Sequence, residues 1–369
     1  MYQSLSFRRI ASAIFILSFV FTTSVSYACT GIIIKTADGQ AIPARTMEFS
    51  FDIESNLLVI PSGITIKSLS SNPDKTGLVY TTKYGFTGMN GVDKPVVFDG
   101  VNEAGVYFGA FYFAGLAQFE ELTEENRENA VSSEELGNFI LGTCASVAEV
   151  KTKLKSINLV GTYIDVINGF APFHYAVSDK YGNSIVIEYT AAGLTIYDNT
   201  INTICNNPGY DWHLTNLSNY VNLSPYNVSA KEVNGMQIKP FGEGSGLLGL
   251  PGDHSSPSRF IRAAVYANSV LTPANTEEGI FTAFHTLNVF DIPKGSIRTK
   301  HEGGEFTDYT IWTSAADTKN QVYYFKTHKN QVIKKIDLKS ALASAKGMVK
   351  VIPSETPRTY EDVSKDFRG

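Results

Sequence analysis

Short apolar runs, many of them alternating or β-branched and separated by turn signals, follow one another along the chain after residue 30. Such runs predict strands. Two lie within 96–113 on either side of the turn 102–105, and two more flank the turn 179–183, so both places predict hairpins. The strands on either side of the second turn are 174–178 and 184–189. The remaining predicted strands are 31–35, 57–60, 64–69, 78–84, 309–314, 322–326 and 331–336.

Apolar positions with helical spacing occur in four segments, 133–141, 146–155, 258–271 and 277–289. Ser146 and Glu149 have the spacing of a capping box, and Pro257 stands at a first helical position. Strands cluster at both ends of the chain and helices lie between them. This order predicts a layered α+β domain in which helices cover two sheets.

The composition is that of an ordinary globular protein, with 43% hydrophobic and 18% charged residues among 369. Acidic residues number 36 and basic residues 31, and no basic run stands out, which argues against a nucleic-acid partner. The 23 Phe and 19 Tyr suit a sheet-rich core and an apolar ligand pocket. The six His show no metal-ligand spacing, and the Gly-rich run 244–249 is followed by Pro251-Gly252 rather than by a helix. We therefore expect neither a metal nor a dinucleotide cofactor.

The first 28 residues have the pattern of an export signal. Arg8 and Arg9 precede a long uncharged and largely apolar run, and Ser26 and Ala28 place small residues at −3 and −1 of a cut before Cys29. The sequence thus predicts a signal peptide over 1–28 and a periplasmic or secreted protein with no membrane attachment after cleavage. An uncleaved anchor is an alternative, since the run is nearly long enough to span a bilayer.

A lipoprotein is the second alternative, because Cys29 directly follows the predicted cut. Lipoprotein signals usually carry Leu three residues before the Cys, where this chain has Ser26. That difference favours cleavage by the ordinary peptidase.

Three cysteines follow the predicted cut, and an odd count in an exported protein implies at least one free thiol. Cys144 lies in a helical pattern and Cys205 in a strand-like run, so we expect both to be small buried hydrophobes. Cys29 at a new N-terminus would combine a thiol nucleophile with an α-amine. The reference pKa of that amine is about 7.7–8.0, so it can serve as a base without histidine.

Seven ordered motifs carry a resemblance to the choloylglycine hydrolases, a family of the N-terminal-nucleophile superfamily that includes bile salt hydrolases and penicillin V acylases. The motifs are CTG at 29–31, TADG at 36–39, ARTMEF at 44–49, FDGVNEAG at 98–105, NNPGYDWH at 206–213, GLLGLPGD at 246–253 and SRFIR at 258–262. The resemblance implies a four-layer αββα sandwich, with two antiparallel sheets between helices. A single domain would span 29–350, and 351–369 would form a polar C-terminal tail.

The resemblance also implies roles for residues near the nucleophile. Cys29 would be both nucleophile and, through its amine, base. Arg45 would favour the thiolate, because a fixed cation lowers a thiol pKa. Glu48 would hold the α-amine, although most relatives have Asp there and the extra methylene moves the oxygens by about 1.5 Å. Without the motif, a lone Arg such as Arg45 is usually a surface or ion-pair residue.

Three further residues are implied for charge stabilisation. Asn206 and the backbone N–H of Tyr112 would donate to the tetrahedral oxyanion, and Arg259 would steady charge near the nucleophile. Without the motifs, Asn206 before 207–208 reads as a turn former and Arg259 as a helix cap. The segment 211–213 reads as structural, with a buried indole.

These roles predict hydrolysis of a linear, non-peptide amide, a small acylated molecule, through a Cys29 thioester. Candidate substrates are penicillin V, conjugated bile salts and N-acyl homoserine lactones. Tyr112 favours penicillin V, since its ring narrows the pocket relative to the Asn of bile salt hydrolases. Relatives that are tetramers imply a possible homotetramer.

Two alternatives from other classes remain. A lipid on Cys29 would block its thiol and amine and leave an acyl-binding lipoprotein. A Cys/His enzyme would need His174, His213 or His254 beside an internal cysteine, and no motif around Cys144 or Cys205 indicates one.

Overall fold

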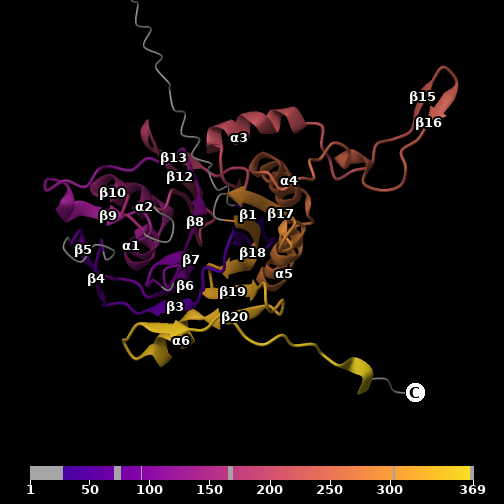
Figure 1. The fold of residues 1–369 in the computed structure, drawn as a ribbon. Helices are drawn as coiled ribbons and strands as arrows, with labels where there is room; N and C mark the ends of the chain where they lie inside the picture. The colour runs from indigo at the N-terminus through magenta and orange to yellow at the C-terminus, as the bar shows by residue number, and fades with distance from the viewer. Residues whose placement is uncertain (1–27, 70–75, 93, 165–168, 302–303, 366–369) are drawn as a thin grey trace, which may run out of the picture.

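The computed structural model describes residues 28–69, 76–92, 94–164, 169–301 and 304–365. The predicted signal peptide, Ala28 apart, lies outside these residues. Two antiparallel sheets form the body of the molecule and helices lie on the outer side of each (Figure 1). The predicted four-layer αββα sandwich is therefore confirmed. No helix in the described segments combines the length and apolar character needed to span a membrane.

The first sheet carries the predicted nucleophile. Its strand order is β14-β1-β2-β18-β19-β20, and β17 also pairs with β18. Helices α4 (Ser256–Ser269) and α5 (Thr276–Leu287) pack on its outer face. The strands are β1 (Cys29–Lys35), β2 (Ala41–Phe49), β14 (Thr203–Ile204), β17 (Ile297–His301), β18 (Gly304–Asp317), β19 (Val322–Thr327) and β20 (Lys334–Asp337).

The second sheet has the order β13-β12-β11-β8-β7-β6-β3-β21. Helices α1 (Leu136–Thr143) and α2 (Val147–Lys153) cover its outer face. The Ser146 side chain accepts from Glu149 N at 3.2 Å, which confirms the predicted cap of α2. The strands are β3 (Leu57–Ile60), β6 (Phe86–Asn90), β7 (Val97–Asn102), β8 (Val106–Tyr112), β11 (Phe173–Asp179), β12 (Ser184–Thr190), β13 (Gly193–Asp198) and β21 (Lys350–Ile352).

Alternation along the strands divides the buried apolar side chains into three main cores, which fill the three spaces between four layers. In β8, Phe108 packs toward α1 and α2, whereas its neighbour Tyr107 points to the opposite face and packs between the two sheets. In β1, Ile32 and Ile34 pack toward α4 and α5. The spacing of apolar positions thus determines which sheet face each helix covers.

Several smaller elements complete the fold. The hairpin β15 (Lys231–Val233) and β16 (Met236–Ile238) follows α3 (Tyr210–Leu217) in the chain and projects far from the sandwich (Figure 1). Helix α6 (Leu338–Ala345) leads into β21, so the second sheet continues to Ile352, two residues into the predicted tail. The other short strands are β4 (Thr65–Lys67), β5 (Val79–Thr81), β9 (Ala130–Ser132) and β10 (Asn158–Val160).

Candidate active site

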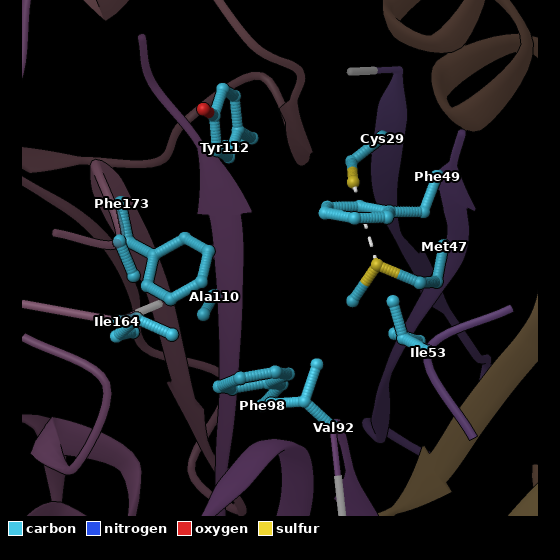
Figure 2. A pocket seen from close by; sticks show the side chains of 11 residues that line it. Cys29, Met47, Phe49, Ile53, Val92, Phe98, Ala110, Tyr112, Ile164 and Phe173 are labelled. Atoms are coloured by element: carbon cyan, nitrogen blue, oxygen red, sulfur yellow. Dashed lines mark hydrogen bonds between the residues drawn. The ribbon is translucent and has the colours of Figure 1, made fainter. Parts of the chain in front are cut away.

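Cys29 is the first residue of β1 and pairs with Met47 of β2. Because Ile32 and Ile34 face the outer helices, alternation turns the Cys29 side chain toward the second sheet. Its Sγ lies 3.9 Å from Met47 Sδ, and both sulfurs face the pocket of Figure 2. Sequence position and strand geometry together place the thiol at the end of a buried strand, beside a cavity.

Gly31, the third residue of the CTG motif, allows the two sheets to approach closely next to Cys29. A Cβ on Gly31 would lie 2.7 Å from Phe111 Cζ and 2.7 Å from Ile204 Cγ2, too close for either neighbour. The Phe111 ring therefore occupies the space that a side chain would fill. That ring also forms one side of the Arg45 site.

Arg45 is fully buried, which excludes the reading of this residue as a surface ion-pair partner. Its guanidinium carbon lies 4.1 Å from the Phe111 ring centroid and 5.3 Å from that of Trp312. It donates to the carbonyls of Ala110 and Thr46, and its Nη2 lies 3.6 Å from Met47 Sδ. These contacts hold one cation beside the Cys29 thiol.

The Cys29 thiol is nonetheless held in its protonated form. Burial raises the pKa of the Cys29 thiol, and the Glu48 carboxylate raises it further, while Arg45 and Arg259 lower it; burial prevails. The prediction that Arg45 favours the thiolate is right in direction, but this cation alone does not overcome desolvation. To act as the predicted nucleophile, this thiol consequently requires a base.

Glu48 lies on the opposite face of β2 from Arg45, as three residues along a strand require. Its Oε1 accepts from Thr310 Oγ1 at 2.7 Å, whereas Oε2 has no hydrogen-bond partner among the described residues. Burial raises the pKa of Glu48 to about 7, despite the opposing effect of Arg259 and of the Thr310 and Thr46 hydroxyls. A buried carboxylate oxygen without a partner is costly, so this atom is suited to receive a further donor.

Asn206 and Arg259 form a connected group around the backbone of Cys29. The Asn206 Oδ1 accepts from Cys29 N at 2.7 Å and from Arg259 Nη2 at 2.8 Å. Arg259 Nη1 donates to Cys29 O and to Thr30 Oγ1, the latter at 2.8 Å, and Nε donates to His254 O at 2.9 Å. Arg259 therefore does more than cap its helix, because it joins α4 to the backbone of Cys29.

Tyr112 contributes its backbone to the same group. Asn206 Nδ2 donates to Tyr112 O at 2.8 Å, which leaves the second hydrogen of that amide for a ligand. Phe113 N donates to Pro172 O, so the alternation of the antiparallel ladder turns the N–H and C=O of Tyr112 away from β11. The Tyr112 N–H thus points to the same side as the carbonyl that Asn206 holds.

A pocket opens beside the thiol, with walls from both sheets (Figure 2). It encloses about 570 Å³ of empty space together with its mouth. Apart from Cys29 and Tyr112, its described lining is wholly apolar: Met47, Phe49, Ile53, Val92, Phe98, Ala110, Ile164, Ala171 and Phe173. Phe173 makes edge-to-face contacts with Tyr112 and with Phe98, so one wall is a continuous aromatic surface.

Sequence reasoning missed several residues that complete this site. Thr310 and Phe173 lie far from the family motifs in sequence, and no local pattern marks them. Trp212 was expected to be a buried indole, but 44% of it is exposed, because α3 turns it to the surface while His213 faces inward.

The Cys/His alternative is not supported by the geometry. His174 Nε2 lies 2.7 Å from the carbonyl oxygen of Cys205 rather than from its thiol. Burial raises the thiol pKa of Cys205 and of Cys144 to about 11 in each case, and both cysteines are free. They are small buried residues, as predicted.

Comparison with known proteins assigns a family to this arrangement. The model of the linear amide C–N hydrolases, choloylglycine hydrolase family, matches residues 29–349. A bile salt hydrolase/transferase of Clostridium perfringens is 32% identical over 315 residues, which cover 84% of this chain and 92% of that protein. A penicillin V acylase of Pectobacterium atrosepticum is 25% identical over 366 residues, covering 92% and 89%.

Solved structures agree in fold. A conjugated bile acid hydrolase from Clostridium perfringens superposes with a TM-score of 0.79 at 29% identity, covering 91% of this chain and 100% of that one. A penicillin V acylase from Agrobacterium tumefaciens superposes with a TM-score of 0.71 at 22% identity, covering 88% and 91%. The match therefore extends over nearly the whole described chain.

Proposed function

Because this chain belongs to the choloylglycine hydrolase family and is a linear amide C–N hydrolase, we propose that it acts through a thioester on Cys29, with the α-amine of the same residue as base. The observation that carries this proposal is that the Cys29 thiol stays protonated and, among the described residues, has no side-chain base in hydrogen-bond contact. Its pKa is raised, and its hydrogen-bond contacts are the Met47 Sδ at 3.9 Å and the backbone N–H of Glu48. A backbone N–H only donates and a thioether sulfur is a weak acceptor, so neither contact is a base for the thiol proton. The nitrogen of Cys29 itself is the remaining nearby candidate.

Removal of residues 1–28 during export would create that base. With Ala28 attached, Cys29 N is an amide with one hydrogen, which Asn206 Oδ1 accepts. Cleavage would convert it to an amine with additional hydrogens and a lone pair. The buried Oε2 of Glu48 could then accept a hydrogen bond from this amine. Such a bond is consistent with Glu48 orienting the amine despite its longer side chain.

The reaction follows in balanced steps. The thiol proton passes to the amine, and Sγ attacks the acyl carbonyl carbon, whose oxygen becomes an oxyanion. The C–N bond breaks as the ammonium returns a proton to the departing nitrogen, leaving an acyl thioester. Water, deprotonated by the same amine, attacks the thioester carbonyl and releases the acid and the thiol.

Asn206 and Tyr112 would stabilise the oxyanion, the first with the second hydrogen of Nδ2 and the second with its backbone N–H. Such a donor contributes about 2.7–4 kcal/mol where one has been removed from the oxyanion hole of another enzyme class. Arg259 would hold Asn206 and the Cys29 carbonyl in fixed relative positions as charge develops on the oxyanion, since it contacts both.

For the acyl group, we favour a penicillin V acylase-like substrate with an aromatic or aliphatic chain. The described pocket lining offers almost no polar partner, so a buried hydroxyl on the substrate would lose its hydrogen bonds with water. Phe98, Phe173 and Tyr112 form a wall suited to an aryl ring. A conjugated bile salt is the second candidate, supported by the 32% identity to the bile salt hydrolase/transferase.

A hydrolysis panel on the purified exported protein tests this choice. The panel is penicillin V, glycocholate and a long-chain N-acyl homoserine lactone, with Cys29→Ser as the inactive control. We expect the highest kcat/KM for penicillin V, and a higher value for glycocholate would assign the bile salt function instead. The intact mass of the same preparation tests maturation: a free Cys29 terminus is expected, and a lipid adduct would establish the lipoprotein.

A further inference from the structure

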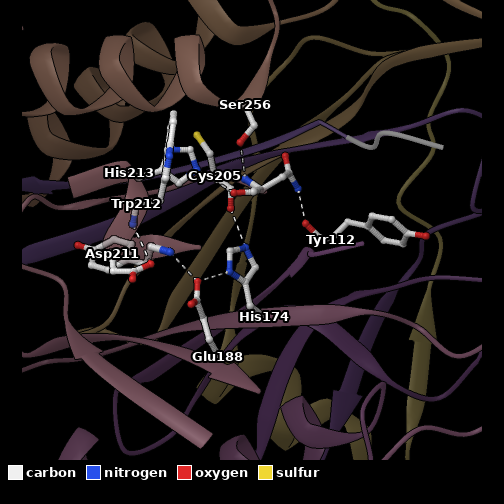
Figure 3. A network of polar contacts seen from close by, with 10 residues as sticks. Tyr112, His174, Glu188, Cys205, Asp211, Trp212, His213 and Ser256 are labelled. Carbon is white, nitrogen blue, oxygen red and sulfur yellow. Dashed lines mark hydrogen bonds and ion pairs between the residues drawn. The ribbon is translucent and has the colours of Figure 1, made fainter. Parts of the chain in front are cut away.

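Two buried histidines hold the backbone on either side of Asn206, and neither belongs to the mechanism above (Figure 3). His174 Nε2 lies 2.7 Å from the carbonyl oxygen of Cys205, and His213 Nε2 lies 2.9 Å from the carbonyl oxygen of Asn206. A carbonyl oxygen only accepts, so each Nε2 must carry a proton and donate. Ser256 Oγ accepts from Asn206 N at 3.0 Å. Three hydrogen bonds therefore fix the peptide groups that flank the Asn206 side chain.

His174 is itself held from two directions. Its Nδ1 lies 3.2 Å from Glu188 Oε1. The same oxygen accepts a hydrogen bond, at 2.9 Å, from the backbone N of Tyr210, which is the first residue of α3. The Phe113 ring stacks on the imidazole with centroids 4.3 Å apart and an interplanar angle of 1°. His174, Glu188 and Phe113 are all buried, so this support excludes water from the Cys205 carbonyl.

His213 is fixed in the same manner from α3. Its ring stacks on Phe260 of α4, with centroids 4.4 Å apart and planes 11° apart. Burial lowers the pKa of His213 to about 4, so the ring is neutral near pH 7 and its single proton lies on Nε2. The tautomer that Asn206 O requires is therefore the one that this environment selects.

From these contacts we infer that His174 and His213 are positioning residues for Asn206, which set the direction of its Nδ2 donor toward the reacting carbonyl. The inference rests on the proposed function, because it takes Asn206 to be an oxyanion donor. Phe173 lines the acyl pocket, whereas His174, the next residue of β11, faces the opposite side. One strand thus contributes both to substrate binding and to the alignment of the oxyanion donor.

Two isosteric variants of His174 separate the contacts. In His174→Gln, the terminal amide reaches the position of Nε2 and still donates to Cys205 O. In His174→Asn, the amide reaches only the position of Nδ1, so the Glu188 contact stays and the Cys205 contact is lost. Both variants should lower the Tm to a similar degree. We expect His174→Asn to lose about 10- to 100-fold in kcat with little change in KM, and His174→Gln to stay within about threefold of wild type.

Two further readouts distinguish positioning from a general loss of structure. Alkylation of Cys29 by iodoacetamide needs no oxyanion donor, so its rate should be unchanged in both variants. In an Asn206→Ala background, His174→Asn should cause less than about a twofold additional loss of kcat, because the group it positions is already absent. If His174→Asn does not fold, His213→Phe and His213→Gln provide the same comparison, since Phe keeps the stack on Phe260 without the donor.

Wild-type kcat in His174→Asn would overturn the inference, and so would equal losses of kcat and alkylation in both variants. A full additional loss in the Asn206→Ala background would also overturn it. Wild-type kcat in Asn206→Ala itself would remove the proposed oxyanion donor and the inference with it. The Asn206→Ala single variant therefore separates failure of the proposed mechanism from failure of the positioning role.

Discussion

Cys29 presents two atoms to different neighbours: its thiol faces Arg45 and Met47, and its nitrogen faces Asn206. Burial raises the pKa of the other two thiols to about 11, despite the lowering effect of Arg259 and Thr30 on Cys205 and of Thr143 and Lys153 on Cys144. Cys29→Ser should therefore lower kcat/KM by about 10³-fold or more, because the serine oxygen is far less acidic. Cys205→Ser and Cys144→Ser should change the Tm more than the rate. Loss of activity in a folded Cys205→Ser protein, with Cys29→Ser still active, would contradict the assignment.

Glu48 makes stability depend on pH in the form that retains Ala28. Its pKa in the folded chain is about 7, above the ordinary value of 4.5, so the folded state binds a proton that the unfolded state has already lost between these values. The unfolding free energy should accordingly fall as pH rises from about 4.5 to 7. Glu48→Gln should flatten this dependence in chemical denaturation measured across the window. An unchanged slope in the variant would show that Glu48 is ionised throughout.

In the mature form, Glu48 would act on the amine. A carboxylate beside an ammonium raises the amine pKa, so Glu48→Gln should lower that pKa and move the acid limb of the pH–rate profile to lower pH. Glu48→Asp should retain appreciable activity if the amine contact can re-form. The kcat/KM profile over pH checks both. An unmoved acid limb with an unchanged rate would make Glu48 a structural acid.

At the scale of elements, regular patterns were predictable and interrupted ones were not. The runs at 57–60 and 322–326 coincide closely with β3 and β19, and the cap at Ser146 begins α2 as predicted. Strand β2 was not recognised as a strand, because Arg45, Glu48 and Pro43 interrupt its apolar positions, although nearly all of it is buried. Helix α3 was missed because its sequence is largely polar. Of the elements at the site, β2 and α3 thus depart from the patterns of ordinary strands and helices, whereas β1, β8 and α4 follow them.

The candidate site was predictable only as far as the motifs extend. Cys29, Arg45, Glu48, Asn206, Arg259 and the backbone of Tyr112 do come together, in agreement with the resemblance. Thr310 was not found and His174 was considered only as a base for an internal cysteine, because they join the site through pairing of β18 with β2 and of β11 with β8. Such long-range register leaves no local signal in a single sequence.

The approach of β1 to β8 yields a prediction of its own. Gly31→Ala would place a Cβ 2.7 Å from both Phe111 and Ile204, and neither can move freely in the core. We expect a loss of about 1–3 kcal/mol in the free energy of unfolding, as overpacking usually costs. Because Phe111 also contacts Arg45, kcat should fall as well. Ile33→Ala, in the same strand, is the control for stability alone; equal kcat in both variants would remove the link to Arg45.

At the scale of the whole molecule, the predicted homotetramer stays a proposal, and the projecting β15–β16 hairpin supports it. Met236 in β16 is 70% exposed, and Phe241, three residues after this strand, is fully exposed. Large apolar side chains on a projecting segment would lose water contact if a second copy of the chain covered them. We expect light scattering to report an oligomer, and Met236→Ser with Phe241→Ser to reduce its mass. A monomeric wild type, or an unchanged mass in the variant, would contradict the proposal.

The central claim is that Cys29 becomes competent only when its own nitrogen is free. The most direct measurement compares turnover of two preparations verified by intact mass, one cleaved before Cys29 and one that retains Ala28, on whichever substrate the cleaved form prefers. Both should fold, with matching circular dichroism. General-base catalysis contributes about 10²–10⁴-fold, so the form with Ala28 should be slower by at least about 100-fold. Comparable turnover by the two forms would contradict the mechanism.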